Sequence, residues 1–196
     1  MIDTLFRPKV QSTLIEPLAK PFTKLPPALL TTIALLLGLA IIPALATNQP
    51  IAATALLALS GLFDTLDGTV ARLQQRASSK GAAFDILSDR IVEFSAIFGL
   101  YLVEPSSRAT LSILMLGSTL LCITSFLVVG IFTENESEKS FHYSSGIMER
   151  TEAFIFFALM MLWPVAFNIL GTAFVLLVAM TGLWRIFQFS LTSVDA

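Results

Sequence analysis

Four aspartates stand close together in this sequence, beside strongly apolar stretches. They are Asp64, Asp67, Asp85 and Asp89. Like charges next to apolar segments repel one another and lose hydration, and divalent cations are the most direct way to offset them. We therefore expect these residues to form a functional site.

The spacing of the aspartates arranges them in two pairs. Asp64 and Asp67 are three residues apart and Asp85 and Asp89 are four apart, so each pair shares one face of a helix. If the two helices pack as an antiparallel pair connected by residues 73–80, the two faces meet in one acidic cluster. Mg²⁺ prefers oxygen ligands and usually engages a few carboxylates together with substrate phosphates. Two such ions would neutralise a diphosphate.

Small residues and one arginine accompany the carboxylates. Gly68 and Ala71 continue the face of Asp64, and Gly81 precedes Asp85. Missing side chains at these positions would let a bulky group approach the backbone, and Arg72 would supply a cation for a phosphate oxygen. Taken singly, each residue is also compatible with tight helix packing or interfacial anchoring. Packing does not require carboxylates, so the joint pattern favours a substrate site.

The composition indicates an integral membrane protein. Of 196 residues, 55% are hydrophobic and 13% charged, and the mean hydropathy of +0.81 lies outside the usual range of soluble domains. A net charge of -2 gives no basic face for nucleic acid. The single cysteine, Cys122, cannot form an intrachain disulfide, and we interpret it as a packing residue.

The apolar stretches predict an all-α polytopic membrane protein, because about 20 apolar residues are needed for one span. We expect residues 25–196 to form one domain of six transmembrane helices. The expected spans are residues 29–46, 51–72, 82–103, 109–132, 150–168 and 171–189. Residues 1–24 are expected to form an amphipathic helix at the membrane interface, because apolar residues recur there at helical spacing.

The distribution of basic residues predicts the orientation. With six spans and both termini on one side, every lysine and arginine except Arg108 lies on the side of the N-terminus. The positive-inside rule makes that side cytoplasmic. The aspartates follow the apolar part of the second span, so they are expected at the cytoplasmic surface.

Together, the singled-out residues follow one pattern: Asp64-x-x-Asp67-Gly68-x-x-Ala71-Arg72, eight residues, then Gly81-x-x-x-Asp85-x-x-x-Asp89. This pattern resembles the signature of the CDP-alcohol phosphatidyltransferase family at every position. Such membrane enzymes transfer a phosphatidyl or similar group from a CDP-linked lipid donor to a polar alcohol and release CMP. The resemblance implies the same reaction here, in a homodimer, with a bacterial inner membrane as the expected location.

The resemblance also implies a role for each motif residue. The four aspartates, Asp64, Asp67, Asp85 and Asp89, would hold two divalent ions, Mg²⁺ or Mn²⁺. Asp89 would in addition deprotonate the acceptor hydroxyl. The CDP group would be bound by Asp67, Gly68, Ala71, Arg72 and Gly81.

Residues near Arg150 indicate the acceptor. Arg90, directly after Asp89, and the run Glu149-Arg150-Thr151-Glu152 are similar to the family branch that uses inositol phosphate, and less closely to users of glycerol phosphate. That branch commonly has a further arginine where this chain has Ala153. We expect Arg150 and Arg90 to bind the acceptor; membrane anchoring, or neutralisation of the aspartates, is the alternative.

Two other functions compete with this interpretation. An ion or metal transporter would also place carboxylates in a membrane, but transporters tend to have internal repeats and sites near the midplane. A structural membrane protein would leave the aspartates unexplained.

His142 is the only histidine and stands in the polar stretch 133–148. It is expected to be a surface residue, with a ligand role as the alternative.

Overall fold

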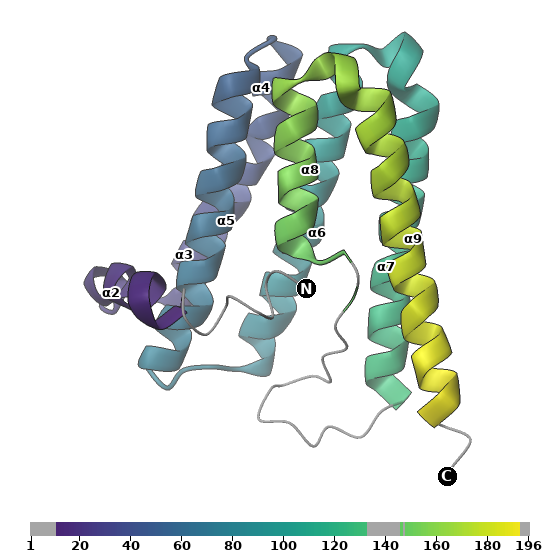
Figure 1. Cartoon of the computed structure of the whole chain (residues 1–196). Helices are drawn as coiled ribbons and strands as arrows, with labels where there is room; N and C mark the ends of the chain where they lie inside the picture. Colours follow the sequence, from purple (N-terminus) through teal and green to yellow (C-terminus); the bar gives the residue numbers. More distant parts are fainter. Residues whose placement is uncertain (1–10, 133–145, 147, 193–196) are drawn as a thin grey trace.

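The computed structural model describes residues 11–132, 146 and 148–192, and all regular secondary structure in this part of the chain is helical (Figure 1). The predicted all-α class is confirmed. In chain order the helices are η1 (Gln11–Ile15), α2 (Glu16–Ala19), η2 (Lys20–Phe22), α3 (Pro27–Leu39), α4 (Ile41–Ala46), α5 (Pro50–Leu73), α6 (Ser79–Val103), α7 (Pro105–Phe132), α8 (Arg150–Leu162), η3 (Pro164–Ala166) and α9 (Phe167–Thr192).

Four segments among the described residues are long and apolar enough to cross a membrane. They are Pro27–Ala46, Pro50–Leu73, Pro105–Phe132 and Pro164–Leu191. The other two expected spans, α6 and α8, fall short for different reasons. The first half of α6 carries most of its charged residues, and α8 has 13 residues, or about 20 Å of helix against a hydrocarbon core of about 30 Å. The count of six spans therefore stays a prediction.

Prolines set two boundaries that differ from the predicted spans. The fifth expected span, residues 150–168, is wrong at its end, because α8 stops at Leu162. Pro164 disfavours helical backbone at Trp163, whose φ and ψ are -128° and 73°. The first span is interrupted between α3 and α4 at Ala40. There Pro43 has no N–H for the carbonyl four residues earlier, and its ring crowds that carbonyl.

The N-terminal segment is not one regular helix in its described part. It consists of the short turns η1, α2 and η2, with Pro17 and Pro21 inside it. Ala19 is fully buried, and the Phe22 ring packs edge-on against Phe63 of α5, with centroids 6.3 Å apart. The segment thus rests on α5 beside the aspartates, while the predicted interfacial helix over residues 1–24 stays a prediction.

Two other helices contact the helix pair that carries the aspartates. Contact between α5 and α6 is slight; α3 packs against both, and α8 contacts both as well. Direct packing of α5 on α6, given above as the condition for one acidic cluster, is therefore slight. Arg150 at the start of α8 contacts both Asp64 of α5 and Asp89 of α6. Figure 1 shows α8 in front of α6 and beside α5.

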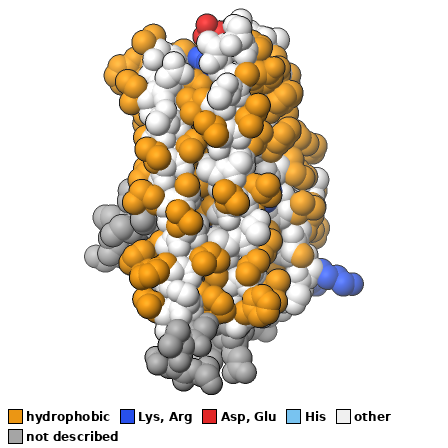
Figure 2. All heavy atoms as spheres, turned by 90° about the vertical axis from the view of Figure 1, so that its right-hand side faces the viewer, with side chains coloured by type: hydrophobic (Ala, Val, Ile, Leu, Met, Phe, Trp, Pro, Cys, Tyr) orange, Lys and Arg blue, Asp and Glu red, His pale blue; other side chains and the backbone are white. Residues whose placement is uncertain are grey.

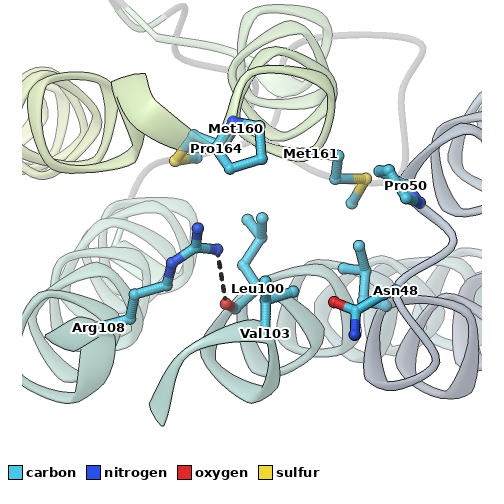
Figure 3. Close-up of a pocket in the computed structure, with 9 residues that line it drawn as sticks. Asn48, Pro50, Leu100, Val103, Arg108, Met160, Met161 and Pro164 are labelled. Carbon is cyan, nitrogen blue, oxygen red and sulfur yellow. Dashed lines mark hydrogen bonds between the residues drawn. The ribbon is translucent and has the colours of Figure 1, made fainter. Parts of the chain in front are cut away.

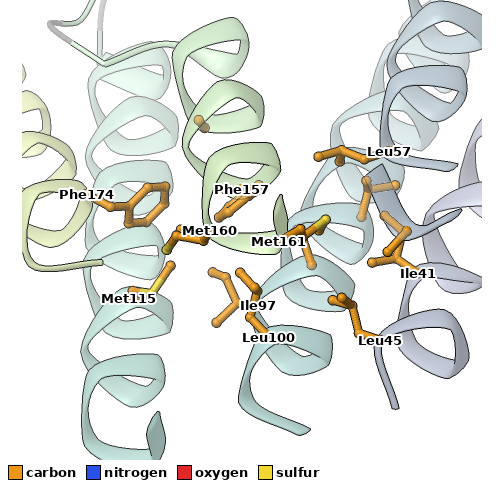
Figure 4. Packing of buried hydrophobic residues seen from close by; sticks show 14 of the residues in the cluster. Ile41, Leu45, Leu57, Ile97, Leu100, Met115, Phe157, Met160, Met161 and Phe174 are labelled. Atoms are coloured by element: carbon orange, nitrogen blue, oxygen red, sulfur yellow. The ribbon is translucent and has the colours of Figure 1, made fainter. Parts of the chain in front are cut away.

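The hydrophobic core lies where α8 meets the other helices (Figure 4). Phe157 of α8 packs on Phe174 of α9, with ring centroids 5.2 Å apart. On the other side of the core, α4 approaches α6 closely: a Cβ at Gly99 would stand 2.8 Å from Leu45 Cδ1. The absence of a side chain at Gly99 leaves room for this approach.

The outer face of α7 and α9 is apolar along its length. Figure 2 shows hydrophobic side chains over most of this face. They include the exposed residues Ile113 and Leu121 of α7 and Leu176 and Leu183 of α9. An apolar surface of this extent marks contact with a membrane or another protein rather than water. Together with the long apolar helices, it makes this an integral membrane protein.

Candidate active site

Three of the four aspartates bring their carboxylates together. Asp64 and Asp67 lie in the second half of α5 and Asp85 in the second turn of α6, and one oxygen of each lies within 4.8 Å of the others. The oxygen ligands of one divalent ion lie about 2.0–2.6 Å from it. These three oxygens are therefore close enough to one another to bind a single ion.

Burial of these carboxylates supports the same interpretation. Asp67 is 5% exposed. Its Oδ2 and Asp85 Oδ1 are buried without a hydrogen-bond donor among the described residues. A buried carboxylate oxygen without a partner is costly, and an all-oxygen donor set suits Mg²⁺ or Mn²⁺. The residues present thus fit a divalent cation.

Asp89 lies outside this group of three and contacts Arg150 instead. Asp89 Oδ1 is 2.7 Å from Arg150 Nη2, and Nη1 of the same guanidinium donates a hydrogen bond to Asp64 Oδ2. Arg150 is the first residue of α8. The residue expected to bind the acceptor therefore bridges two of the expected metal ligands, a contact that the sequence did not predict.

Arg90, the second residue expected at the acceptor, is engaged by acidic neighbours. Its Nη1 donates to Glu93 Oε2 at 2.7 Å, and its Nη2 lies 4.0 Å from Asp89 Oδ2. Glu93 is buried. This geometry favours the alternative that Arg90 neutralises the acidic residues of α6.

The residues expected to bind CDP lie on the last turns of α5 and the first turn of α6. Apart from the backbone of α5 itself, a Cβ at Gly68 would have only Arg72 Nη1 within 4 Å among the described residues, at 3.5 Å, so this face of α5 is open. Arg72 Nη2 donates to Thr69 Oγ1 at 3.2 Å. Ala71 is half-buried. Gly81 is exposed, and its N–H donates to Ser78 Oγ at 3.1 Å, which caps α6.

No role was predicted for a further buried cation, which lies on α9. Arg185 of α9 is buried, and its Nη1 lies 3.5 Å from the carbonyl oxygen and from Sγ of Cys122. The Met148 N–H donates to Thr181 Oγ1 at 2.9 Å, which ties the segment before α8 to α9. The sequence does contain a sign of the importance of Arg185: it is a lone arginine late in an apolar helix, and ionisable residues in such helices usually have a function.

His142, expected to be a surface residue, lies outside the described residues.

A helical bundle in which two neighbouring helices carry a cluster of aspartates suits a membrane enzyme that binds divalent ions. A family model described as CDP-alcohol phosphatidyltransferase matches residues 24–185. The chain therefore belongs to the CDP-alcohol phosphatidyltransferase family, which confirms the resemblance seen in the motif.

Two curated relatives extend the likeness over most of the chain. An Escherichia coli protein named inner membrane protein YnjF is 28% identical over 202 residues, covering 98% of this chain and 97% of the relative. A phosphatidylinositol phosphate synthase of Corynebacterium glutamicum is 30% identical over 154 residues, covering 75% of this chain and 68% of the relative.

Solved structures share the fold. The phosphatidylinositol phosphate synthase of Mycobacterium tuberculosis with CDP-DAG bound has a TM-score of 0.74 at 18% sequence identity, covering 90% of this chain and 93% of that one. The same enzyme in complex with manganese and citrate has a TM-score of 0.75, again at 18% identity, covering 90% of this chain and 88% of that one.

Proposed function

We propose that this protein transfers a phosphatidyl group from a CDP-linked lipid, such as CDP-diacylglycerol, to the hydroxyl of a polar alcohol and releases CMP. The observation that carries this proposal is the convergence of Asp64, Asp67 and Asp85 within 4.8 Å beside the open face at Gly68. A relative named phosphatidylinositol phosphate synthase and a similar structure with CDP-DAG bound support it.

Two divalent ions, Mg²⁺ or Mn²⁺, are proposed at the aspartates. Asp64, Asp67 and Asp85 would hold them, with Asp89 completing the donor set. When bound, the ions would neutralise the diphosphate and stabilise the leaving CMP. Arg72 would contact a phosphate oxygen, and Gly68 would leave room for the CDP group.

Asp89 is proposed as the general base. Its carboxylate would take the proton of the acceptor hydroxyl as the new O–P bond forms and the P–O bond to CMP breaks. The 2.7 Å contact with Arg150 orients this carboxylate beside the other three. Mutually close carboxylates of this kind need a fixed cation, and the guanidinium supplies one.

The proposed acceptor is inositol phosphate or glycerol 3-phosphate. Arg150 is the main candidate for its phosphate group, because its side chain is 27% exposed and a guanidinium forms bidentate contacts with phosphate oxygens. Arg90 is the second candidate, although Glu93 and Asp89 already contact it. The two named phosphatidylinositol phosphate synthases support an acceptor of this class.

The site is proposed to face the cytoplasm, in a six-span homodimer of a bacterial inner membrane. The turn between α5 and α6 carries Arg76, and Lys80 is the second residue of α6. Basic residues at this end of the bundle, close in sequence to the aspartates, are expected at a cytoplasmic surface. A relative named inner membrane protein supports the location.

One assay tests the reaction and the acceptor together. Purified protein is incubated with CDP-diacylglycerol, Mg²⁺ and a panel of alcohols with and without phosphate, and CMP release is measured. Inositol phosphate or glycerol 3-phosphate should give the fastest release. Preference for free inositol or serine would reject the acceptor, and no release with any alcohol would reject the reaction.

A further inference from the structure

A cavity of about 250 Å³ lies at the end of the bundle opposite the aspartates (Figure 3). Its walls include the buried residues Leu100 of α6 and Met160 of α8, and the exposed residues Asn48 and Pro164 border it. Asp64 is fourteen residues beyond the start of α5, about 21 Å along the helix. The cavity is therefore separate from the candidate active site.

Arg108 of α7 lines this cavity with a buried positive charge. Its side chain is 4% exposed, its Nη1 donates to the Leu100 carbonyl oxygen at 3.0 Å, and its guanidinium carbon lies 4.3 Å from the centroid of the Phe167 ring. Figure 3 shows the guanidinium turned toward the Leu100 carbonyl at the side of the cavity.

Arg108 has no close counter-charge among the described residues. Within the part of the chain that the structure describes, its nitrogens form no ion pair within 4.0 Å; Glu104, which is exposed, acts on it from farther away. Arginine keeps its charge in proteins and has five N–H donors. A buried cation without a counter-charge is costly, so an anion in the cavity would stabilise this end of the bundle.

Apolar side chains are exposed beside the cavity. Ile51 follows the lining residue Pro50, and Val165 follows the lining residue Pro164; both are strongly exposed, as is Trp163. Aromatic residues at the ends of spans are typical of the interfacial zone of a membrane. Ligand sites for drug-sized molecules are about 300–1,000 Å³, so this cavity suits the head of an amphiphile whose chains lie on the apolar surface outside.

We propose that this cavity binds the phosphate group of an anionic membrane lipid in the leaflet opposite the aspartates. Arg108 provides the counter-charge through the N–H groups that do not contact Leu100. Asn48 provides an amide at the rim. The lipid acts as a bound structural ligand and takes no part in the transfer reaction, so the proposal stands independently of the proposed function.

Native mass spectrometry of the purified full-length protein tests this. The protein is equilibrated in detergent with equal amounts of phosphatidylglycerol and phosphatidylcholine, and the lipids retained per chain are counted. We expect phosphatidylglycerol to be retained at least about fivefold more often, and Arg108→Gln to lower its retention about tenfold, as for a lost charge-assisted contact. Arg76→Gln, which removes an exposed arginine at the other end of the bundle, should leave retention unchanged.

A second variant keeps the test decisive, because Arg108→Gln also weakens the contact with Leu100. Val103 lines the cavity and is partly exposed; Val103→Trp fills the space while leaving Arg108 in place, and should lower retention by a similar factor. Equal retention of the two lipids by the wild type, or full retention in Val103→Trp, overturns the proposal. If inorganic phosphate raises the Tm of delipidated wild type but not of Arg108→Gln, without any lipid preference, the ligand is a free anion and the lipid assignment fails.

Discussion

Arg150 Nη2 lies 2.7 Å from Asp89 Oδ1, while Nη1 of the same guanidinium donates to Asp64. Asp64 is on α5 and Asp89 on α6, so the first residue of α8 joins the two helices that carry the aspartates. The Phe154 ring, one turn along α8, lies 5.1 Å from the guanidinium carbon. Because the donors of a guanidinium form a rigid planar fork, this contact fixes the two carboxylates relative to each other.

Arg150→Ala is expected to raise the KM for a phosphorylated acceptor by about tenfold or more, consistent with a lost charge-assisted contact of about 1.5–3 kcal/mol. Affinity for the CDP-linked donor should fall by a smaller factor, because the carboxylates of the site remain. Arg150→Lys keeps the charge but not the fork, so it should rescue only part of the loss. Initial rates of CMP release against acceptor concentration measure this, and an unchanged KM in Arg150→Ala would assign the residue to a structural role.

Asp89→Asn should lower the rate of the transfer reaction while leaving binding of the CDP-linked donor nearly unchanged. An amide cannot take the acceptor's proton, so the rate should fall by about two to four orders of magnitude, the usual range for a general base. Donor binding, measured by titration with CDP-diacylglycerol, should stay within about threefold, because three other carboxylates remain. If the variant loses metal and donor binding together, Asp89 is chiefly a ligand and not the base.

Gly68→Leu should raise the KM for the CDP-linked donor by about tenfold or more without lowering Tm. Apart from the backbone of α5 itself, a Cβ at Gly68 meets only Arg72 Nη1 among the described residues, at 3.5 Å. The larger side chain therefore projects into the space proposed for CDP rather than into the core. Gly117→Leu is the matched control, since a Cβ there has no described neighbour within 4 Å. A donor KM equal to that of the control would show that Gly68 does not face the donor.

Gly99→Leu tests the packing of α4 on α6. A Cβ at this position would stand 2.8 Å from Leu45 Cδ1, and overpacking of a tight core costs about 1–3 kcal/mol. The free energy of unfolding should fall by that amount in a denaturant titration, whereas Gly117→Leu should have little effect. Equal stability of the two variants would contradict the close approach of these helices.

The elements that hold the aspartates could be predicted from local sequence. Residues 51–72 were expected as a span and α5 runs from Pro50 to Leu73, because an apolar run bounded by proline and polar residues specifies a helix without tertiary information. The spacing of Asp64, Asp67 and Asp85 likewise placed them on helix faces that converge. Residue type and periodicity were sufficient for this part of the site.

The contacts between distant segments could not be predicted in this way. Arg150 is 86 residues from Asp64, and no local pattern shows that the start of α8 inserts beside α5 and α6. For the same reason, direct packing of α5 on α6 could be given only as a condition, and the contacts of α3 and α8 with both helices could not be predicted. The cavity at Arg108 also depends on tertiary structure, because its walls come from several helix ends.

Metal-dependent CMP release is the most direct test of the central claim, that the carboxylates of Asp64, Asp67 and Asp85 form the site of phosphatidyl transfer. Protein stripped with EDTA is assayed with CDP-diacylglycerol and inositol phosphate, before and after addition of Mg²⁺ or Mn²⁺. Glu104→Gln, which changes an exposed carboxylate at the other end of the bundle, is the control for Asp67→Asn. The account predicts no CMP release without metal, and restored release with metal in the wild type and in Glu104→Gln. In folded Asp67→Asn the rate should be at least a hundredfold lower, which corresponds to about 2.7 kcal/mol in activation free energy. Full activity in metal-free buffer, or wild-type activity in Asp67→Asn, would contradict it.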